Sequence, residues 1–208
     1  MIAIIDYGVG NLFSLKSSLA AVGAEAVVTN DPEVIRNADK VILPGVGAFG
    51  DAMEKLRSSG MEQIVSDVAR NGKPLMGICL GMQMLFEESH EYGVHRGLGL
   101  LPGKVVSLKG MIREGLQIPH IGWNGLHFQS RNCPLFADVK ENECVYFVHS
   151  FHAIGCQESL VCTAEYDIEV TAAVAHRNIY GCQFHPEKSG PVGLKILRAF
   201  SQLEVSSC

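Results

Sequence analysis

Short apolar runs alternate with helical patterns along the first ninety residues. Residues 2–5 form an unbroken apolar run, which is typical of a strand buried on both faces. Residues 12–22 repeat apolar side chains at the 3.6-residue helical period, with Asn11 suited to cap this helix and Gly23 to end it. The alternation predicts repeated βαβ units, and so a mostly parallel central sheet flanked by helices.

The same half of the chain contains further expected elements. Three more strands are predicted at residues 26–29, 40–43 and 74–78. A short helical turn is expected to begin at Asp31 and Pro32, because proline suits the first position of a helix. A longer helix has apolar side chains on one face from Met61 to Val68.

From about residue 103 the pattern changes to one strand after another. The expected strands are residues 104–108, 118–123, 144–149, 160–165, 169–175 and 178–184. Gly, Asn and Pro separate these runs, which predicts additional antiparallel strands in the same sheet or beside it. A last helix begins near Pro191 and has Val192, Ile196, Phe200 and Leu203 on one face. No repeat or linker divides the chain, so we expect one α/β domain over residues 1–208.

Composition excludes several classes of protein. The 208 residues are 47% hydrophobic and 19% charged, which excludes a disordered or collagen-like chain. A net charge of −5 argues against nucleic acid as the main partner, and the absence of long apolar stretches argues against a membrane span or signal peptide. Seven cysteines cannot all pair within the chain and include no CxxC, so we expect a reducing cytoplasm.

One cysteine stands between two glycines at a predicted strand-to-helix turn. An apolar strand leads into Gly77-Ile78-Cys79-Leu80-Gly81, and a helical pattern follows. Such a turn holds a nucleophile in a strained, exposed conformation, and the glycines let neighbouring backbone pass close by. The free N–H groups at a helix start also favour a thiolate. Most cysteines are small buried hydrophobic residues, but this context favours Cys79 as a nucleophile.

A thiolate nucleophile needs a histidine base, and the base needs a third group that fixes its tautomer. His185 follows an apolar run, and Glu187 stands two residues further on. In an extended chain residues i and i+2 point the same way, so the carboxylate can lie beside the imidazole. The pair would also fit a strand-end histidine and a solvated charge. Together with Cys79 it predicts a base and its orienting carboxylate.

The other histidines are weaker candidates. His120 and His149 lie among apolar strand residues and are expected to be hydrogen-bonded core or interface groups. The remaining five are expected in loops or at edges: His90, His95, His127, His152 and His176. No spacing of histidines indicates a metal site, and no cofactor is expected.

Acyl chemistry at a thiolate requires N–H donors aimed at a developing oxyanion. One candidate is the amide of Leu80, directly after the nucleophile. The other is the glycine-rich loop containing Gly45, Val46 and Gly47, which follows a predicted parallel strand at the end where such sheets bind ligands. Its spacing matches neither the phosphate-binding loop nor the dinucleotide motif. An ordinary turn is the alternative.

With these residues identified, the chain resembles the class I, triad-type glutamine amidotransferases over nearly its whole length. Gly-Ile-Cys-Leu-Gly-Met-Gln at 77–83 and Gln-Phe-His-Pro-Glu at 183–187 form a specific pair of motifs. Within this family, five segments resemble the glutaminase subunits of imidazole glycerol phosphate synthases: residues 6–11, 43–49, 119–124, 146–150 and 185–190.

This resemblance implies a role for each site residue. Cys79 would attack the side-chain carboxamide of glutamine, His185 would pass a proton to the departing ammonia, and Glu187 would orient His185. Water would then hydrolyse the thioester to glutamate, with Leu80 and the loop of Gly45 to Gly47 holding the oxyanion. The residues expected to border the glutamine are Gln83, His149, Ser150 and Phe151. A tyrosine is common at the last position, so a contact through its hydroxyl group is in doubt here.

The resemblance also implies a partner. In this family the ammonia passes to a (β/α)₈-barrel cyclase, which produces imidazole glycerol phosphate on the route to histidine. The chain shows no eight βα repeats, so we expect the cyclase to be a separate subunit in a heterodimer. Trp123 and Lys188 are candidates for the interface, against the alternatives of a core aromatic residue and a solvated charge.

Three alternatives remain at this point. The same chemistry could serve another acceptor, as in anthranilate, carbamoyl phosphate or pyridoxal phosphate synthesis, although such a protein should lack the segments at 119–124 and 188–190. The triad could hydrolyse an unrelated amide or peptide. The chain could also be a non-enzymatic scaffold, which predicts a missing Cys, His or Glu.

Overall fold

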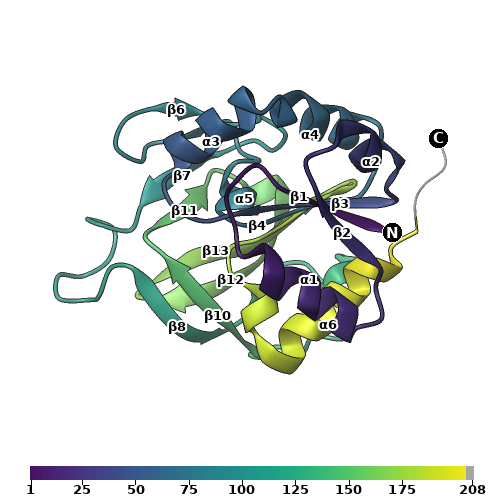
Figure 1. Ribbon diagram of the computed structural model, residues 1–208. Helices are drawn as coiled ribbons and strands as arrows, with labels where there is room; N and C mark the ends of the chain where they lie inside the picture. Colours follow the sequence, from purple (N-terminus) through teal and green to yellow (C-terminus); the bar gives the residue numbers. More distant parts are fainter. Residues whose placement is uncertain (205–208) are drawn as a thin grey trace.

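The central sheet contains eight strands in the order β2-β1-β3-β4-β14-β13-β12-β9 (Figure 1). The computed structural model describes residues 1–204. The strands are β1 (Ile2–Ile5), β2 (Ala26–Thr29), β3 (Lys40–Gly45), β4 (Leu75–Cys79), β9 (His127–Phe128), β12 (Leu160–Tyr166), β13 (Ile168–His176) and β14 (Ile179–Cys182). The strands from β2 to β14 are parallel, and those from β14 to β9 are antiparallel.

Helices cover both faces of this sheet (Figure 1). They are α1 (Leu12–Ala21), α2 (Pro32–Asn37), α3 (Phe49–Ser58), α4 (Met61–Arg70), α5 (Leu80–Gln83) and α6 (Gly190–Gln202). Side chains alternate along β1: Ile2 and Ile4 pack with α1 and α6 on one face, and Ala3 and Ile5 pack with α2, α3 and α4 on the other. Burial on both faces explains the unbroken apolar run of this strand.

Six strands lie beside the central sheet. A two-stranded sheet pairs β8 (His120–Gly125) with β10 (Cys144–His149). A four-stranded sheet has the order β11-β7-β5-β6, formed by β5 (Glu88–Ser89), β6 (His95–Arg96), β7 (Lys104–Ser107) and β11 (Phe151–Ile154). Three short 3₁₀ helices complete the elements: η1 (Pro134–Phe136), η2 (Gln157–Ser159) and η3 (Pro186–Lys188).

The expected fold class is confirmed: the protein is a single α/β domain with a mixed central sheet. The second-half strands both extend this sheet and form the two smaller ones. Helix α3 was missed, because the glycine-rich segment before it reads as loop. Strand β11 was also missed, and the strand expected at 118–123 lies at His120–Gly125.

The helix caps follow local chemistry only in part. The Asp31 side chain accepts a hydrogen bond from the Glu33 amide at the start of α2, where the sequence predicts that a helical turn begins. Asn11 occupies the cap position of α1 without a side-chain cap hydrogen bond. Within residues 1–204, no helix is both long and apolar enough to cross a membrane. One of the seven cysteines, Cys208, lies outside the described residues.

Candidate active site

Cys79 lies at the point where β4 turns into α5. Its backbone has φ 55° and ψ −112°, a region that residues other than glycine rarely adopt. The turn stands at the carboxyl-terminal end of the parallel strands, beside the end of β3. The predicted strained strand-to-helix turn is therefore confirmed.

Glycines around this turn are required by close backbone contacts. A Cβ atom on Gly77 would stand 2.6 Å from the carbonyl oxygen of Gly81, and one on Gly81 would overlap the carbonyl oxygen of Leu43. A Cβ on Gly45 would stand 2.7 Å from the amide nitrogen of Gly81. Strands β3 and β4 and helix α5 can approach this closely only without side chains at these positions.

His185 and Glu187 form a buried pair directly after β14. The His185 Nδ1 atom is 2.8 Å from the Glu187 Oε1 atom, and both side chains are almost fully buried. Burial alone would lower the pKa of His185, but hydrogen bonds and charge from Cys79 and Glu187 raise it to about 9. The structure thus brings the three residues of the predicted triad together.

Ser189 holds the segment that contains this pair. Its hydroxyl group donates a 2.6 Å hydrogen bond to the carbonyl oxygen of His185 and accepts one from the amide of Tyr146 on β10. The His185 amide in turn donates to the carbonyl oxygen of Tyr146. Sequence reasoning did not single out Ser189, since its role depends on β10, about forty residues earlier.

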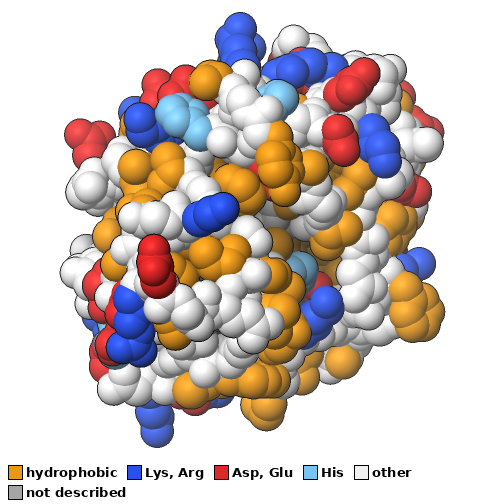
Figure 2. All heavy atoms as spheres, turned by 90° about the vertical axis from the view of Figure 1, so that its left-hand side faces the viewer, with side chains coloured by type: hydrophobic (Ala, Val, Ile, Leu, Met, Phe, Trp, Pro, Cys, Tyr) orange, Lys and Arg blue, Asp and Glu red, His pale blue; other side chains and the backbone are white. Residues whose placement is uncertain are grey.

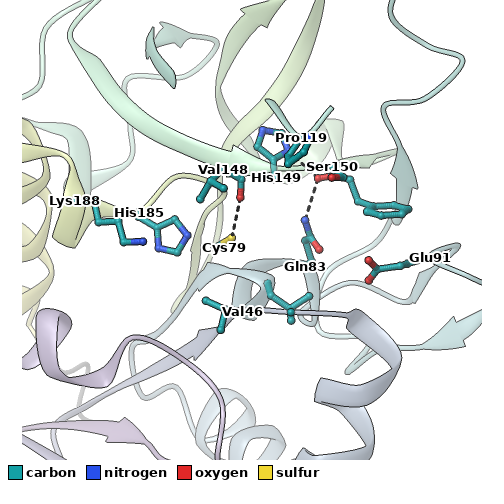
Figure 3. A pocket seen from close by; sticks show the side chains of 13 residues that line it. Val46, Cys79, Gln83, Glu91, Pro119, Val148, His149, Ser150, His185 and Lys188 are labelled. Atoms are coloured by element: carbon teal, nitrogen blue, oxygen red, sulfur yellow. Dashed lines mark hydrogen bonds between the residues drawn. The ribbon is translucent and has the colours of Figure 1, made fainter. Parts of the chain in front are cut away.

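A cavity of about 290 Å³ opens beside Cys79. Figure 3 shows Cys79 in its middle, with His185 and Lys188 toward one end and Glu91, Gln83 and Ser150 toward the other. The predicted residues that line it are Val46, Gly47, Cys79, Leu80, Gln83, His149, Ser150, Phe151, His185 and Lys188. Gly45 and Glu187 do not line it: Gly45 packs under the turn, and Glu187 lies behind His185.

Gln83 connects the two halves of the site. Its Nε2 atom donates to the backbone carbonyl oxygen of Phe151, at 3.0 Å, and to Oε1 of Gln183, at 2.9 Å. Gln183 is fully buried, and its own Nε2 atom is 3.8 Å from the Cys79 sulfur. This amide pair joins α5 to the segment after β14 and borders the nucleophile.

Sequence reasoning missed Glu91. Its carboxylate is buried at one end of the cavity and accepts a 2.5 Å hydrogen bond from the amide of Phe49, the first residue of α3. The positive end of that helix favours a negative charge there. Glu91 lies in a loop between β5 and β6 without a recognisable motif, so only the tertiary structure identifies it.

His120 and His149 are buried and hydrogen-bonded, as expected. The His120 ring stacks on Phe147 and Tyr166, with ring centroids 5.0 Å and 3.9 Å away. His152 lies on β11, the edge strand of the four-stranded sheet, as the expectation of a loop or edge position allowed. It is buried, and neither ring nitrogen has a hydrogen-bond partner among the described residues.

The two interface candidates lie in different places. Lys188 is exposed at the mouth of the cavity. Trp123 is 55% exposed on β8, away from the cavity lining, and contacts Tyr146 edge to face. Trp123 is therefore not a core aromatic residue.

The fold and the Cys-His-Glu site together define a class of protein. The family described as glutamine amidotransferase class-I matches residues 3–202, so the chain belongs to that family. A solved structure described as a glutamine amidotransferase has the same fold, with a TM-score of 0.74 at 19% identity, covering 98% of this chain and 100% of that one.

Within this class, the curated relatives are more specific. The imidazole glycerol phosphate synthase subunit HisH of Sulfurimonas denitrificans is 49% identical, over 97% of this chain and 98% of the relative. The subunit of the same name from Bacillus licheniformis is 50% identical, over 97% of this chain and 96% of the relative. The chain therefore belongs to the HisH group of class I glutamine amidotransferases.

Proposed function

We propose that this chain hydrolyses glutamine through a thioester on Cys79 and passes the ammonia to a separate cyclase subunit that makes imidazole glycerol phosphate in histidine biosynthesis. The convergence of Cys79 and His185 at one cavity, with Glu187 hydrogen-bonded behind His185, carries this proposal. Each of the three has the chemistry that acyl transfer requires: a nucleophile, a base and an orienting carboxylate.

In the first step, the Cys79 thiolate attacks the side-chain carbonyl carbon of glutamine. The hydrogen bond of His185 Nδ1 to Glu187 leaves Nε2 to face the sulfur. The raised pKa of His185 favours the imidazolium form beside the thiolate. When the C–N bond breaks, His185 gives its proton to the nitrogen, and ammonia leaves.

Two sets of backbone amides are suited to hold the oxyanion. The amide of Leu80 follows the nucleophile at the start of α5. The loop of Val46 and Gly47 lines the opposite wall of the cavity, and Gly47 has a φ of +93°. Gly45 lies outside the cavity lining and permits the close packing of β3 on α5. In the second step, His185 activates a water molecule that cleaves the thioester and releases glutamate.

The far end of the cavity suits the amino-acid end of glutamine. The buried carboxylate of Glu91 can pair with the substrate's α-ammonium group. Gln83, His149, Ser150 and Phe151 border the same end. The hydrogen bonds of Phe151 here use its backbone carbonyl oxygen, which accepts from Gln83 and His149, so these contacts do not depend on a tyrosine hydroxyl group.

The partner is expected to cover the mouth of the cavity. Figure 2 shows this face, where hydrophobic side chains surround a hollow. Ile121 and Trp123 are 46% and 55% exposed on the outward side of β8, and Lys188 stands at the mouth. Exposed apolar side chains on neighbouring positions of one strand suit a protein partner, and a covered mouth would keep ammonia out of solvent.

The alternatives are weaker. A scaffold with an inactive triad predicts a lost or displaced residue, yet all three are present and joined. Another ammonia acceptor would fit the site equally well. The relatives named imidazole glycerol phosphate synthase subunit favour the cyclase over such acceptors.

Glutamate release from glutamine tests the proposal, measured with and without a cyclase subunit and its nucleotide ligand. Cys79→Ala should abolish turnover while partner binding persists, because the thiol is small. Cys133→Ala is the matched control, since this buried cysteine lies outside the cavity lining and should leave turnover intact. If wild-type protein releases no glutamate in either condition, the proposed function is wrong.

A further inference from the structure

A row of hydrogen bonds crosses the molecule from the cavity to the antiparallel part of the central sheet. His149 Nδ1 lies 2.9 Å from the carbonyl oxygen of Phe151, and His149 Nε2 lies 3.0 Å from His120 Nδ1. His120 Nε2 lies 2.7 Å from Asn124 Oδ1, and Asn124 Nδ2 lies 2.9 Å from the carbonyl oxygen of Glu165. The two histidine rings are thus the central members of one row.

Both ends of this row are carbonyl oxygens, which can only accept. His149 Nδ1 must therefore carry a proton toward Phe151, and Asn124 Nδ2 must donate to Glu165. That orientation leaves Asn124 Oδ1 as an acceptor, so His120 Nε2 must carry a proton too. If both rings are neutral, no proton lies between His120 Nδ1 and His149 Nε2, which face each other at 3.0 Å. The complete row needs a third ring proton, and with it one positive charge.

Without a ligand, the surroundings oppose that charge. Burial and the nearby histidines His120, His152 and His185 together lower the pKa of His149 to about 3, against a raising hydrogen bond to the backbone of Phe151. Burial also lowers the pKa of His120, against a raising hydrogen bond from Asn124. The groups stacked on His120 are the uncharged rings of Phe147 and Tyr166. Both shifts favour a neutral pair in the free protein, which leaves one link of the row without a proton.

Glutamine brings a carboxylate to this end of the cavity. His149 lines the cavity beside Pro119 and Ser150, and Gln83 and Glu91 line it further along (Figure 3). On the proposed function, Glu91 takes the substrate's ammonium group, which leaves the α-carboxylate in the neighbourhood of His149. A carboxylate in this low-dielectric site supplies the counter-charge that an imidazolium needs.

We propose that glutamine binding draws one proton from solvent onto the His120–His149 pair, and that His120 is a positioning residue for the His149–Phe151 side of the glutamine site. One N–H bond forms, no electrons are transferred, and the proton returns to solvent when product leaves. The shared proton completes the row from Phe151 to Glu165 and so orders the segment that borders the substrate. This inference rests on the proposed function.

Ring-nitrogen NMR of histidine-labelled protein tests the proton count directly, without a substitution at either histidine. The free protein at neutral pH should show two protonated nitrogens among the four of the pair. In Cys79→Ala protein with its cyclase partner and saturating glutamine, three should be protonated. A third ring proton already present in the free protein would overturn the inference.

Calorimetry in buffers of different ionisation enthalpy measures the same event as proton uptake. Binding of glutamine to the Cys79→Ala complex should take up about one proton more than binding to the Cys79→Ala/His120→Gln complex. In the His120→Gln variant, the amide side chain at position 120 can donate a hydrogen bond toward His149 but does not titrate. A second variant, His120→Asn, places a shorter amide side chain at the same position and should lose the same proton uptake. The matched control is His176→Gln, at an exposed histidine of β13, which should keep the full proton uptake on glutamine binding.

Kinetics separate this inference from the proposed function. With Cys79 intact, His120→Phe should raise KM for glutamine about tenfold, the worth of roughly one hydrogen bond, with a much smaller change in kcat. Equal proton uptake with and without His120 would overturn the inference while glutamine hydrolysis stands. Failure of the wild-type complex to release glutamate would instead overturn the proposed function, and the free-protein NMR spectrum would still test the pair.

Discussion

The two sides of the cavity hold their catalytic residues by different physical means. On the β3–β4 side, backbone contacts position Cys79: Gly45, Gly77 and Gly81 let two strands and a helix pack without side chains between them. On the β10–β14 side, side-chain hydrogen bonds position His185, through Glu187 and Ser189. The position of the nucleophile therefore depends on glycines that lack side chains, and the position of the base depends on specific polar partners.

Substitution of the nucleophile itself should have the largest effect on activity. Cys79→Ser keeps the size of the side chain but replaces the thiolate with a weakly nucleophilic hydroxyl group. We expect kcat for glutamine hydrolysis to fall by roughly 10⁴-fold or more. The circular dichroism spectrum and the unfolding midpoint should stay close to wild type. Substantial turnover by this variant would show that another group is the nucleophile.

Glu187→Gln should damage the base while leaving the nucleophile turn intact. The amide keeps the shape but removes the charge that helps to raise the pKa of His185 to about 9. We expect kcat to fall by roughly 10²- to 10⁴-fold, as for other triads that lose their carboxylate. The basic limb of the kcat/KM profile should move to lower pH, because the imidazolium loses its stabilising partner. An unshifted profile would contradict the role of Glu187.

The same raised pKa has a consequence for stability. The folded-state pKa of His185 lies above its ordinary value of about 6.5. The contribution of its charge to the free energy of unfolding is therefore fully present below about pH 6.5 and is lost as pH rises through about 9. The stability difference between wild type and Glu187→Gln should therefore be larger at mildly acidic than at strongly basic pH. Urea unfolding at both pH values measures this difference.

Gly81→Ala tests the steric side of the comparison. Its Cβ would overlap the carbonyl oxygen of Leu43, which is backbone and cannot rotate away. We expect a loss of about 3 kcal/mol or more in the free energy of unfolding, measured in urea, and a displaced nucleophile. Gly8→Ala is the matched control, because Gly8 has a φ of +82° with nothing near its Cβ, and should cost only about 1–2 kcal/mol. A loss for Gly81→Ala no larger than that for Gly8→Ala would show that close packing against Leu43 does not explain the glycine at position 81.

Phe151→Tyr should have the smallest effect. The hydrogen bonds that join Phe151 to Gln83 and His149 use its backbone carbonyl oxygen, so an added hydroxyl group leaves them unchanged. We expect KM for glutamine to change by less than about twofold. A large decrease in KM would show that a tyrosine hydroxyl group contributes to binding in this site.

The sequence by itself determined the features that depend on neighbouring residues. The strained turn at Cys79 is local, because a strand, two glycines and a helix start within a few residues produce it. The pair of His185 and Glu187 is local too, although its geometry differs from the extended chain that the sequence predicts: Glu187 lies in the 3₁₀ helix η3, which begins directly after His185. The alternation of apolar runs and helical patterns likewise predicts the parallel half of the sheet.

Only the tertiary structure decided which distant groups complete the site. Glu91 meets the start of α3, Ser189 joins β10 to the base, and His120 joins β8 to the cavity. These contacts connect segments tens of residues apart, and no periodicity or motif records them. Their strength comes from burial, where hydrogen bonds and charges are poorly screened, and burial is a property of the packed molecule.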